Sequence, residues 1–529
     1  MARALRAGRD VGSPNVRSGT APGRPSSPSR RLLAGGLAVV AIAIAGFLLW
    51  KKTDTPAGSP EIRHRDPALP QSLAVLPFES VGAAPDSSYF ADGMTEELIT
   101  QIGQISGLRV ISRTSAFAFR GRRELTIRQI AETLGVTTVL EGSVRRDAQR
   151  LRVVARLINV ARDSQLLSRD FDRDLTDIFA VQHEIARDIA TALQLRFGVT
   201  GPGSSLLVPT RDLVAYDLYL QGRALLNRRN PSALGSAVDL FQQAIAHDSR
   251  FAAAHAGLAE AQLLRVVIGN DRPSQYIPLA LAAATEARRL DTLNAASLAV
   301  LGHLKFSVLH DYPGGKQDLR RALELDSFNL SGSLYLSIAL ADEGRFPEAI
   351  AELRRSLGRD PLSAPLRGTL ARILLFAGEY DEAIREAGIS TSINPQWSLP
   401  VWVRGHALVE QGKTTEALAS FRAAVAAGGP QAIDSAFLAY GLAKNGDSVA
   451  ARRVLGALHA ERRQVYNLDG AIGVAYLGLG DRTEALRWFE RMARGSGSGA
   501  YFRFPATAPI RRDPRFLRIL RAMGLPPEE

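Results

Sequence analysis

Three aspartates, Asp170, Asp172 and Asp174, alternate along the segment LLSRDFDRD. Alternate residues of a β-strand point to the same face, so carboxylates at this spacing could hold a cation. Arg169 precedes them and Arg173 stands between the last two, however, and such alternation of opposite charges is typical of a solvated strand. The pattern therefore favours a charge ladder over a metal site.

Two pairs of histidines have spacings that could share a helix face, His247 with His255 and His303 with His310. Because no carboxylate or cysteine stands beside them in ligand register, we interpret all four as surface or satisfied core residues. The chain also lacks a G-x-x-x-x-G-K-[ST] phosphate loop, a G-x-S-x-G elbow and an H-E-x-x-H motif. The sequence thus predicts no catalytic residue, cofactor, metal or small-molecule substrate.

A basic stretch, SRTSAFAFRGRR from Ser112 to Arg123, carries Phe117 and Phe119 between its charges. One interpretation is a patch for an acidic partner. We favour the other, a strand with apolar residues inside and polar residues outside.

The best candidates for binding are residues that would line the inner groove of a helical repeat array. They combine aromatic, basic and acidic side chains, the composition of a binding hot spot. They are Arg372, Phe376, Trp402, His406 and Glu410. For Trp402 the alternative is packing between repeats, and the sequence leaves both open.

The elements that would position these residues follow a period of 34. Glycines recur at Gly344, Gly378, Gly412, Gly446 and Gly480. A second series, five residues later, consists of alanines 349, 383, 417, 451 and 485. This period resembles that of tetratricopeptide (TPR) helix pairs, with the glycine ending the first helix and the alanine allowing close packing in the second.

The repeats are expected to run over 214–494 as about eight helix pairs, of which the first three are irregular. After GSGSG, residues 495–529 should close the array with an amphipathic capping helix. A TPR superhelix presents a concave groove, so the expected partner is a protein segment bound there.

The net charge of +12 is concentrated at the N-terminus, where residues 1–31 hold seven arginines and one aspartate. An uncharged stretch of 19 residues, Leu32–Trp50, follows and is long enough to span a membrane. A buried core helix and a cleaved signal peptide are the two other interpretations. The charge bias predicts a single-pass protein of the bacterial inner membrane, with a disordered cytoplasmic tail (1–31) and the bulk of the chain in the periplasm. It gives no reason to expect a nucleic-acid partner.

Residues 51–71 are rich in proline and indicate a linker, and residues 199–213 indicate another. Between them, residues 72–198 alternate strand and helix patterns and end in a meander. We therefore expect an α/β domain with a mixed sheet there. The whole chain is predicted to be multidomain.

The segments SLAVLPF, SYFADGMTEELITQIGQISGLRVISRTSAFAFRGR, LGVTTVLEGSVRR and DFDRDLTDIFAVQHEIARDIATAL carry a family resemblance. They resemble the TolB-N-terminal-like (FlgO/CsgG-like) α/β domain, which precedes TPR arrays in CadC-type regulators and adenylate-cyclase-associated proteins. Those relatives commonly carry a DNA-binding, cyclase or kinase module upstream, where this chain has only the tail and the span. The resemblance therefore implies no output activity of this chain.

Taken together, the sequence predicts a non-enzymatic scaffold or sensor at the cell envelope, with a homodimer as a further option. One alternative is the sensory component of a signalling system whose output module is a separate protein. Another is an enzyme with an unrecognised site in 72–198, for which Asp170, Asp172 and Glu141 would be the first residues to test.

Overall fold

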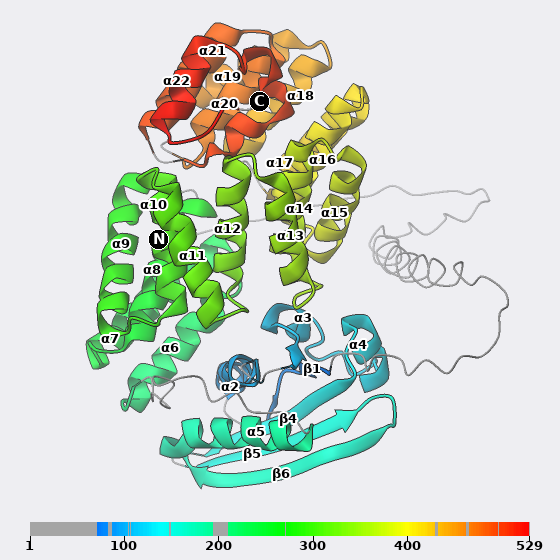
Figure 1. Cartoon of the computed structure of the whole chain (residues 1–529), viewed down its shortest axis with the longest axis vertical. Coiled ribbons are helices and arrows are strands. Elements are labelled where there is room, and N and C mark those ends of the chain that lie inside the picture. The colour runs from blue at the N-terminus through cyan, green and yellow to red at the C-terminus, as the bar shows by residue number, and fades with distance from the viewer. Residues whose placement is uncertain are drawn as a thin grey trace, which may run out of the picture. The chain divides into compact units, whose positions relative to one another are not determined.

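The computed structural model describes residues 71–82, 87–103, 105, 107–147, 150–193, 210–269, 271–428, 432–461, 465–495 and 497–527 (Figure 1). Within these ranges no helix is long and apolar enough to cross a membrane. The predicted tail 1–31 and span Leu32–Trp50 lie outside them, as does the predicted linker 51–71 apart from its last residue. Most of the second predicted linker, 199–209, also lies outside.

The first described part of the chain forms one mixed sheet, with the strand order β3-β1-β4-β5-β6 and with β2 paired to β4. The strands are Ser72–Val75 (β1), Glu79–Ser80 (β2), Arg109–Val110 (β3), Thr138–Asp147 (β4), Arg150–Asn159 (β5) and Ser164–Asp174 (β6). β1 pairs in parallel with β3 and β4, whereas β4, β5 and β6 pair antiparallel. The predicted mixed sheet is confirmed, and so is its hairpin of β4 and β5.

Burial explains why these sequences form strands. β1 lies in the centre of the sheet, and all four of its residues are buried because both faces are covered. β5 instead alternates, since Leu151, Val153, Ala155 and Leu157 face one hydrophobic core and the residues between them are exposed or half-buried. Such alternation is expected of a strand with one solvated face.

Three helices, α2 (Ser87–Ile102), α5 (Ile178–Ala192) and α4 (Ile127–Leu134), cover the two faces of the sheet. α2 and α5 share a core with β5, and Figure 1 shows α5 lying along β5 and β6. α4 packs on the opposite face. It begins with a capping box between Thr126 and Gln129 and ends at Gly135, where φ is +63°.

The stretch Ser112–Arg123 is not a strand, contrary to our prediction. Its first part forms a short helix, α3 (Arg113–Phe117), and turns follow. The buried residues explain the error, because Ser112, Ser115 and Ala116 recur at helical spacing rather than at every second position.

The array comprises eight helix pairs from α6 to α21. The first four pairs are α6 (Leu213–Leu226) with α7 (Pro231–His247), α8 (Ala252–Val267) with α9 (Pro273–Leu290), α10 (Ala295–Val308) with α11 (Tyr312–Leu325), and α12 (Leu330–Asp342) with α13 (Phe346–Leu357). The last four are α14 (Ala364–Ala377) with α15 (Tyr380–Ile393), α16 (Ser398–Glu410) with α17 (Thr414–Gly428), α18 (Ala432–Lys444) with α19 (Ser448–Glu461), and α20 (Leu468–Gly478) with α21 (Arg482–Arg494).

The periodic glycines and alanines, called the glycine and alanine ladders below, have the predicted roles of ending the first helix of each pair and allowing close packing in the second. All five ladder glycines adopt positive φ, between +75° and +90°, in the turn between the two helices of a pair. The five ladder alanines are completely buried. A residue without a Cβ is needed in the left-handed turn, and a small one is needed where two helices touch.

The α/β domain contacts the array at two places. Asp360, in the turn between α13 and α14, accepts hydrogen bonds from the backbone N–H (3.1 Å) and the hydroxyl (2.6 Å) of Ser115 in α3. Glu96 of α2 forms ion pairs with Arg113 (3.1 Å) and with Arg223 of α6. Half-buried ion pairs of this kind hold two elements in one register.

Beyond α21, the chain forms two 3-10 segments, η3 (Gly499–Arg503) and η4 (Pro505–Ile510), and then helix α22 (Pro514–Ala522). α22 lies against α21 (Figure 1), with the rings of Phe516 and Phe489 6.2 Å apart. The predicted capping helix is therefore present.

Candidate functional site

The inner face of the array is occupied by the chain's own C-terminal segment, residues 497–527. Its first half runs along the first helices of successive repeats, namely α12, α14, α16, α18 and α20. Solenoids of stacked helical repeats commonly use their concave surface for binding, so we take this groove as the candidate site.

Phe504 is the centre of the contact. Its ring centroid lies 4.8 Å from that of His406, 5.0 Å from Phe376, 5.7 Å from Phe437 and 6.1 Å from Trp402. These rings come from three successive repeats, and Phe504 is 1% exposed. The four residues form an aromatic cage, in which edge-to-face pairs add to the effect of apolar burial.

Tyr501 fills the neighbouring position. Its ring stacks on Phe437 with centroids 6.3 Å apart, and it covers Gly470 of α20. A Cβ built on Gly470 would lie 2.5 Å from Cγ of Tyr501, so only glycine lets the segment approach this closely.

Arg503 lies between the two aromatic residues and is 1% exposed. Its Nε donates a hydrogen bond to the carbonyl of Asp342 (2.8 Å), the last residue of α12, and Nη2 donates to the carbonyl of Pro526 (3.0 Å). The C-terminal end of a helix carries partial negative charge, which suits a guanidinium. Polar recognition thus accompanies the aromatic contact.

The Asp342 side chain fixes the start of the segment. Its carboxylate accepts hydrogen bonds from the hydroxyls of Tyr312 (3.0 Å) and Ser498 (3.2 Å) and from the N–H of Gly499 (2.9 Å). Burial raises the pKa of Asp342 to about 7, although these hydrogen bonds act in the opposite direction. A carboxyl of this kind changes charge near neutral pH.

The structure brings together four of the five predicted groove residues. Phe376, Trp402 and His406 belong to the cage, and the Arg372 guanidinium interacts electrostatically with Tyr501 and Asp342. Of the two interpretations left open for Trp402, the structure shows packing between repeats, because Trp402 is 5% exposed and packs both on Phe437 of the next repeat (4.6 Å) and on Phe504. Glu410 is exposed at the end of α16, near the charges of Lys444 and Arg511.

Several polar atoms of the groove are not satisfied by the C-terminal segment. Nε of Arg372, Nε2 of His406 and Oδ2 of Asp434 are buried and have no hydrogen-bond partner among the described residues. Burial also lowers the pKa of His406 to about 3 and raises that of Asp434 to about 7. Each unmatched buried group costs about 1–3 kcal/mol, so the segment fits the groove incompletely.

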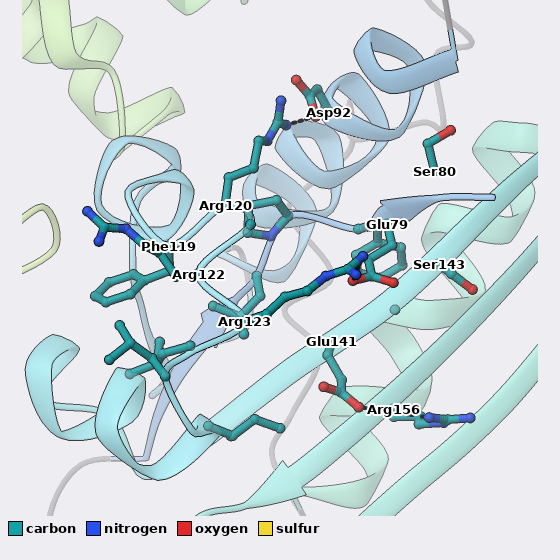
Figure 2. A pocket seen from close by; sticks show the side chains of 18 of the residues that line it. Glu79, Ser80, Asp92, Phe119, Arg120, Arg122, Arg123, Glu141, Ser143 and Arg156 are labelled. Carbon is teal, nitrogen blue, oxygen red and sulfur yellow. Dashed lines mark ion pairs between the residues drawn. The ribbon is translucent and has the colours of Figure 1, made fainter. Parts of the chain in front are cut away.

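A second cavity, of about 660 Å³, lies in the α/β domain at the carboxyl end of β1 (Figure 2). Ligands of open α/β sheets commonly bind at this end. Figure 2 shows Arg120 turned toward Asp92, Arg123 toward Glu79, and Glu141 beside Arg156. Each of these arginines has a carboxylate partner, and Arg122, which also lines the cavity, pairs with Glu124 (3.3 Å).

The other candidates from the sequence do not form a site. Asp170 pairs with Arg152, and Asp172 and Asp174 pair with Arg150, which confirms the charge ladder. His303 is buried on α10 between Phe306 and Tyr335, whereas His310 follows the end of that helix. Among the described residues no group of histidines and carboxylates could hold a metal ion.

Sequence reasoning missed the role of residues 497–513. The signal was visible as a cluster of aromatic residues, YFRFP, one residue after the glycine-rich GSGSG. It could not be assigned, because Ser498 and its partner Asp342 are 156 residues apart.

Comparison with known proteins agrees with the repeat architecture. The tetratricopeptide repeat family matches residues 308–364, 340–397 and 473–491. These ranges include Gly344, Gly378 and Gly480, three of the five periodic glycines. The array therefore contains TPR repeats.

A protein of Rhizobium meliloti (strain 1021) named "Putative adenylate cyclase 3" is 38% identical over 213 residues. The match spans 40% of this chain and only 36% of that relative.

Several solved structures are also similar. The human IFIT1 dimer with m7Gppp-AAAA is 14% identical over 60% of this chain and 80% of its own, with a TM-score of 0.42. YrrB, described as a TPR protein with an unusual peptide-binding site, is 19% identical over 41% of this chain and 97% of its own, with a TM-score of 0.26. PilF of Pseudomonas aeruginosa is 20% identical over 38% of this chain and 91% of its own, with a TM-score of 0.29.

Proposed function

We propose that this chain is a membrane-anchored TPR protein that binds protein partners, as a scaffold or sensor at the bacterial cell envelope. The observation that carries the proposal is the occupied groove. The inner face of the array binds an extended protein segment through an aromatic cage and a charged anchor, and that segment is its own C-terminus. A surface that recognises one such segment is suited to recognise another.

Membrane anchoring rests on the sequence alone. The uncharged stretch Leu32–Trp50, with arginines before it and Lys51 and Lys52 after it, would place the array in the periplasm of a bacterial cell. The α/β domain would then be a TolB-like module held close to the membrane. We assign the chain no catalytic step, because the groove is lined by packed aromatic residues and the α/β cavity by mutually paired charges.

A second candidate function is supported by the relative named as an adenylate cyclase. Under this alternative, the chain is the non-catalytic sensory part of a signalling system. A separate protein that binds the tail 1–31 supplies the output. Capture of a cytoplasmic protein that requires residues 1–31 would favour it over a scaffold.

Photo-crosslinking in cells tests the proposed function. A photoreactive amino acid at position 410, on the edge of the groove, should give an adduct with a defined partner protein. The matched control is position 456, which is equally exposed but lies on the second helix of its pair, α19. An adduct pattern identical at both positions would contradict partner binding in the groove.

A further inference from the structure

We propose that the groove is a recognition site for an extended segment with an aromatic–arginine–aromatic sequence, and that residues 497–513 occupy it as an internal ligand which a partner protein displaces. The proposal rests on the proposed function and specifies the chemistry of the partner. The groove displays this specificity directly, since Tyr501, Arg503 and Phe504 each have their own subsite.

The aromatic subsites are built by the repeats and do not require the segment. Trp402 contacts Phe437 at 4.6 Å, and His406 contacts Phe421, Phe437 and Tyr440 at 5.0, 4.8 and 4.7 Å between ring centroids. The cage is therefore held by its own packing against neighbouring helices. A preformed site of this kind loses little freedom when a ligand enters.

The arginine subsite is built by the repeats only in part. One acceptor for Arg503 is the backbone carbonyl of Asp342 at the end of α12, and the carboxylate of Asp342 is held by Tyr312 of the array. The other acceptor, the carbonyl of Pro526, belongs to the C-terminal segment itself. A cation from another chain that reaches this helix end would therefore keep the first partner and not the second.

Release of the segment requires only non-covalent contacts to break. At its start these are hydrogen bonds from Ser498 and Gly499 to the carboxylate of Asp342. The contacting part of the segment consists of the 3-10 segments η3 and η4 rather than a helix of the repeat pattern. Covalent attachment keeps such a ligand at a high effective concentration, which a partner must overcome.

The incomplete fit gives a partner its advantage. Nε of Arg372 and Oδ2 of Asp434 are buried beside the segment without a hydrogen-bond partner among the described residues. A partner segment that offers an acceptor to the first and a donor to the second would satisfy groups that residues 497–513 leave unmatched. The expected partner thus combines the aromatic–arginine–aromatic sequence with polar side chains of both kinds.

The test cuts the covalent link between the segment and the folded chain, and then measures whether an added peptide of the same sequence replaces the segment in the groove. A site for a specific protease is inserted after Gly495 in the full-length protein, which is folded and then cleaved. A fluorescent synthetic peptide of residues 497–527 is added, and its anisotropy is measured. We expect the peptide to enter the groove after cleavage and not before.

Peptide variants test the specificity. Phe504→Ala and Arg503→Ala peptides should bind at least about tenfold more weakly than the native peptide. An Arg512→Ala peptide is the matched control, because Arg512 is exposed, and it should bind like the native peptide.

Three results would overturn the proposal. They are a cleaved chain that unfolds, a cleaved chain that stays folded but never exchanges its segment, and Phe504→Ala and Arg503→Ala peptides that bind as well as the native one. None of these results bears on the proposed function itself. That function is tested by the partner adduct at position 410, which does not depend on the peptide.

Discussion

Gly412 isolates the contribution of a single ladder glycine. Its φ is +75°, and a Cβ built on it would have no neighbour within 4 Å, so an added methyl group would meet only backbone strain. We expect Gly412→Ala to lower the free energy of unfolding by about 1 kcal/mol. Denaturant titration of the purified chain measures this change.

Gly388 provides the matched control. It lies within helix α15, has no neighbour within 4 Å of a built Cβ, and does not adopt positive φ. Gly388→Ala should therefore raise the free energy of unfolding by about 0.5–1 kcal/mol. Destabilisation by both substitutions would show that the left-handed conformation is not what the ladder requires.

His406 makes the groove sensitive to acid. Burial lowers its pKa to about 3, so the folded chain keeps the imidazole neutral where an unfolded chain would protonate it. The stability that it contributes is fully present above the ordinary pKa of about 6.5 and is lost as the pH falls toward 3. We expect His406→Leu to make unfolding less dependent on pH between about 6 and 4.

The measurement is the midpoint of chemical unfolding at several pH values. Leucine also removes the unmatched Nε2, so stability at neutral pH should be nearly unchanged despite the lost ring contacts. A slope against pH equal to that of the native chain would contradict the assignment of a buried neutral histidine.

At the scale of single residues, the ladders could be predicted because their causes are local. A left-handed turn selects glycine and a helix contact selects alanine, whatever lies elsewhere in the chain. Trp402 could be placed on the inner face but not as buried, because its cover, Phe504, lies 102 positions further along the sequence. Exposure depends on contacts between distant segments, which a repeat pattern does not contain.

Among the elements, α3 joins the α/β domain to the array. Ser115 donates two hydrogen bonds to Asp360, and both residues are buried. Asp360→Ala would leave these donors unmatched, at a cost of about 1–3 kcal/mol. We expect the α/β domain to become susceptible to limited proteolysis before the array does.

Asp381→Ala is the control for this substitution. Asp381 is exposed, and its carboxylate accepts a hydrogen bond from Gln411 within the array. Exposed substitutions usually change stability by less than about 0.5 kcal/mol, so the cleavage pattern should not change. Equal protease sensitivity of the two variants would rule out Asp360 as a link between the domains.

The elements also show where sequence patterns are ambiguous. α4 and the β4–β5 hairpin were predictable, because a capping box and strict alternation each indicate a single structure. α3 was mistaken for a strand, since its five residues are too few to establish a period, and its burial comes from the array that it contacts. Tertiary contact decided its conformation.

At the scale of the whole molecule, the membrane topology is open to direct test. If Leu32–Trp50 spans the inner membrane with the basic tail inside, alkaline phosphatase fused after Thr210 should be active in a bacterial host. A fusion after residue 31, before the span, should be inactive and serves as the control. An inactive fusion after Thr210 would place the array in the cytoplasm.

The central claim is that a partner protein binds where the C-terminal segment now lies. The chain contains no cysteine, so a Gly470→Cys, Tyr501→Cys pair can lock the segment in place without competing thiols. A Cβ built on Gly470 lies 2.5 Å from Cγ of Tyr501, which puts cysteines at the two positions within reach of a disulfide. The variant also carries a photoreactive residue at position 410. Partner binding can then be compared in one protein between the oxidised state, with the segment locked, and the reduced state, with the segment free to leave.

The deciding measurement is the yield of the partner adduct in membrane preparations, first oxidised and then reduced. We predict an adduct only after reduction, when the segment can leave the groove. An equal yield in both states would contradict the account, because the partner would then bind without displacing residues 497–513.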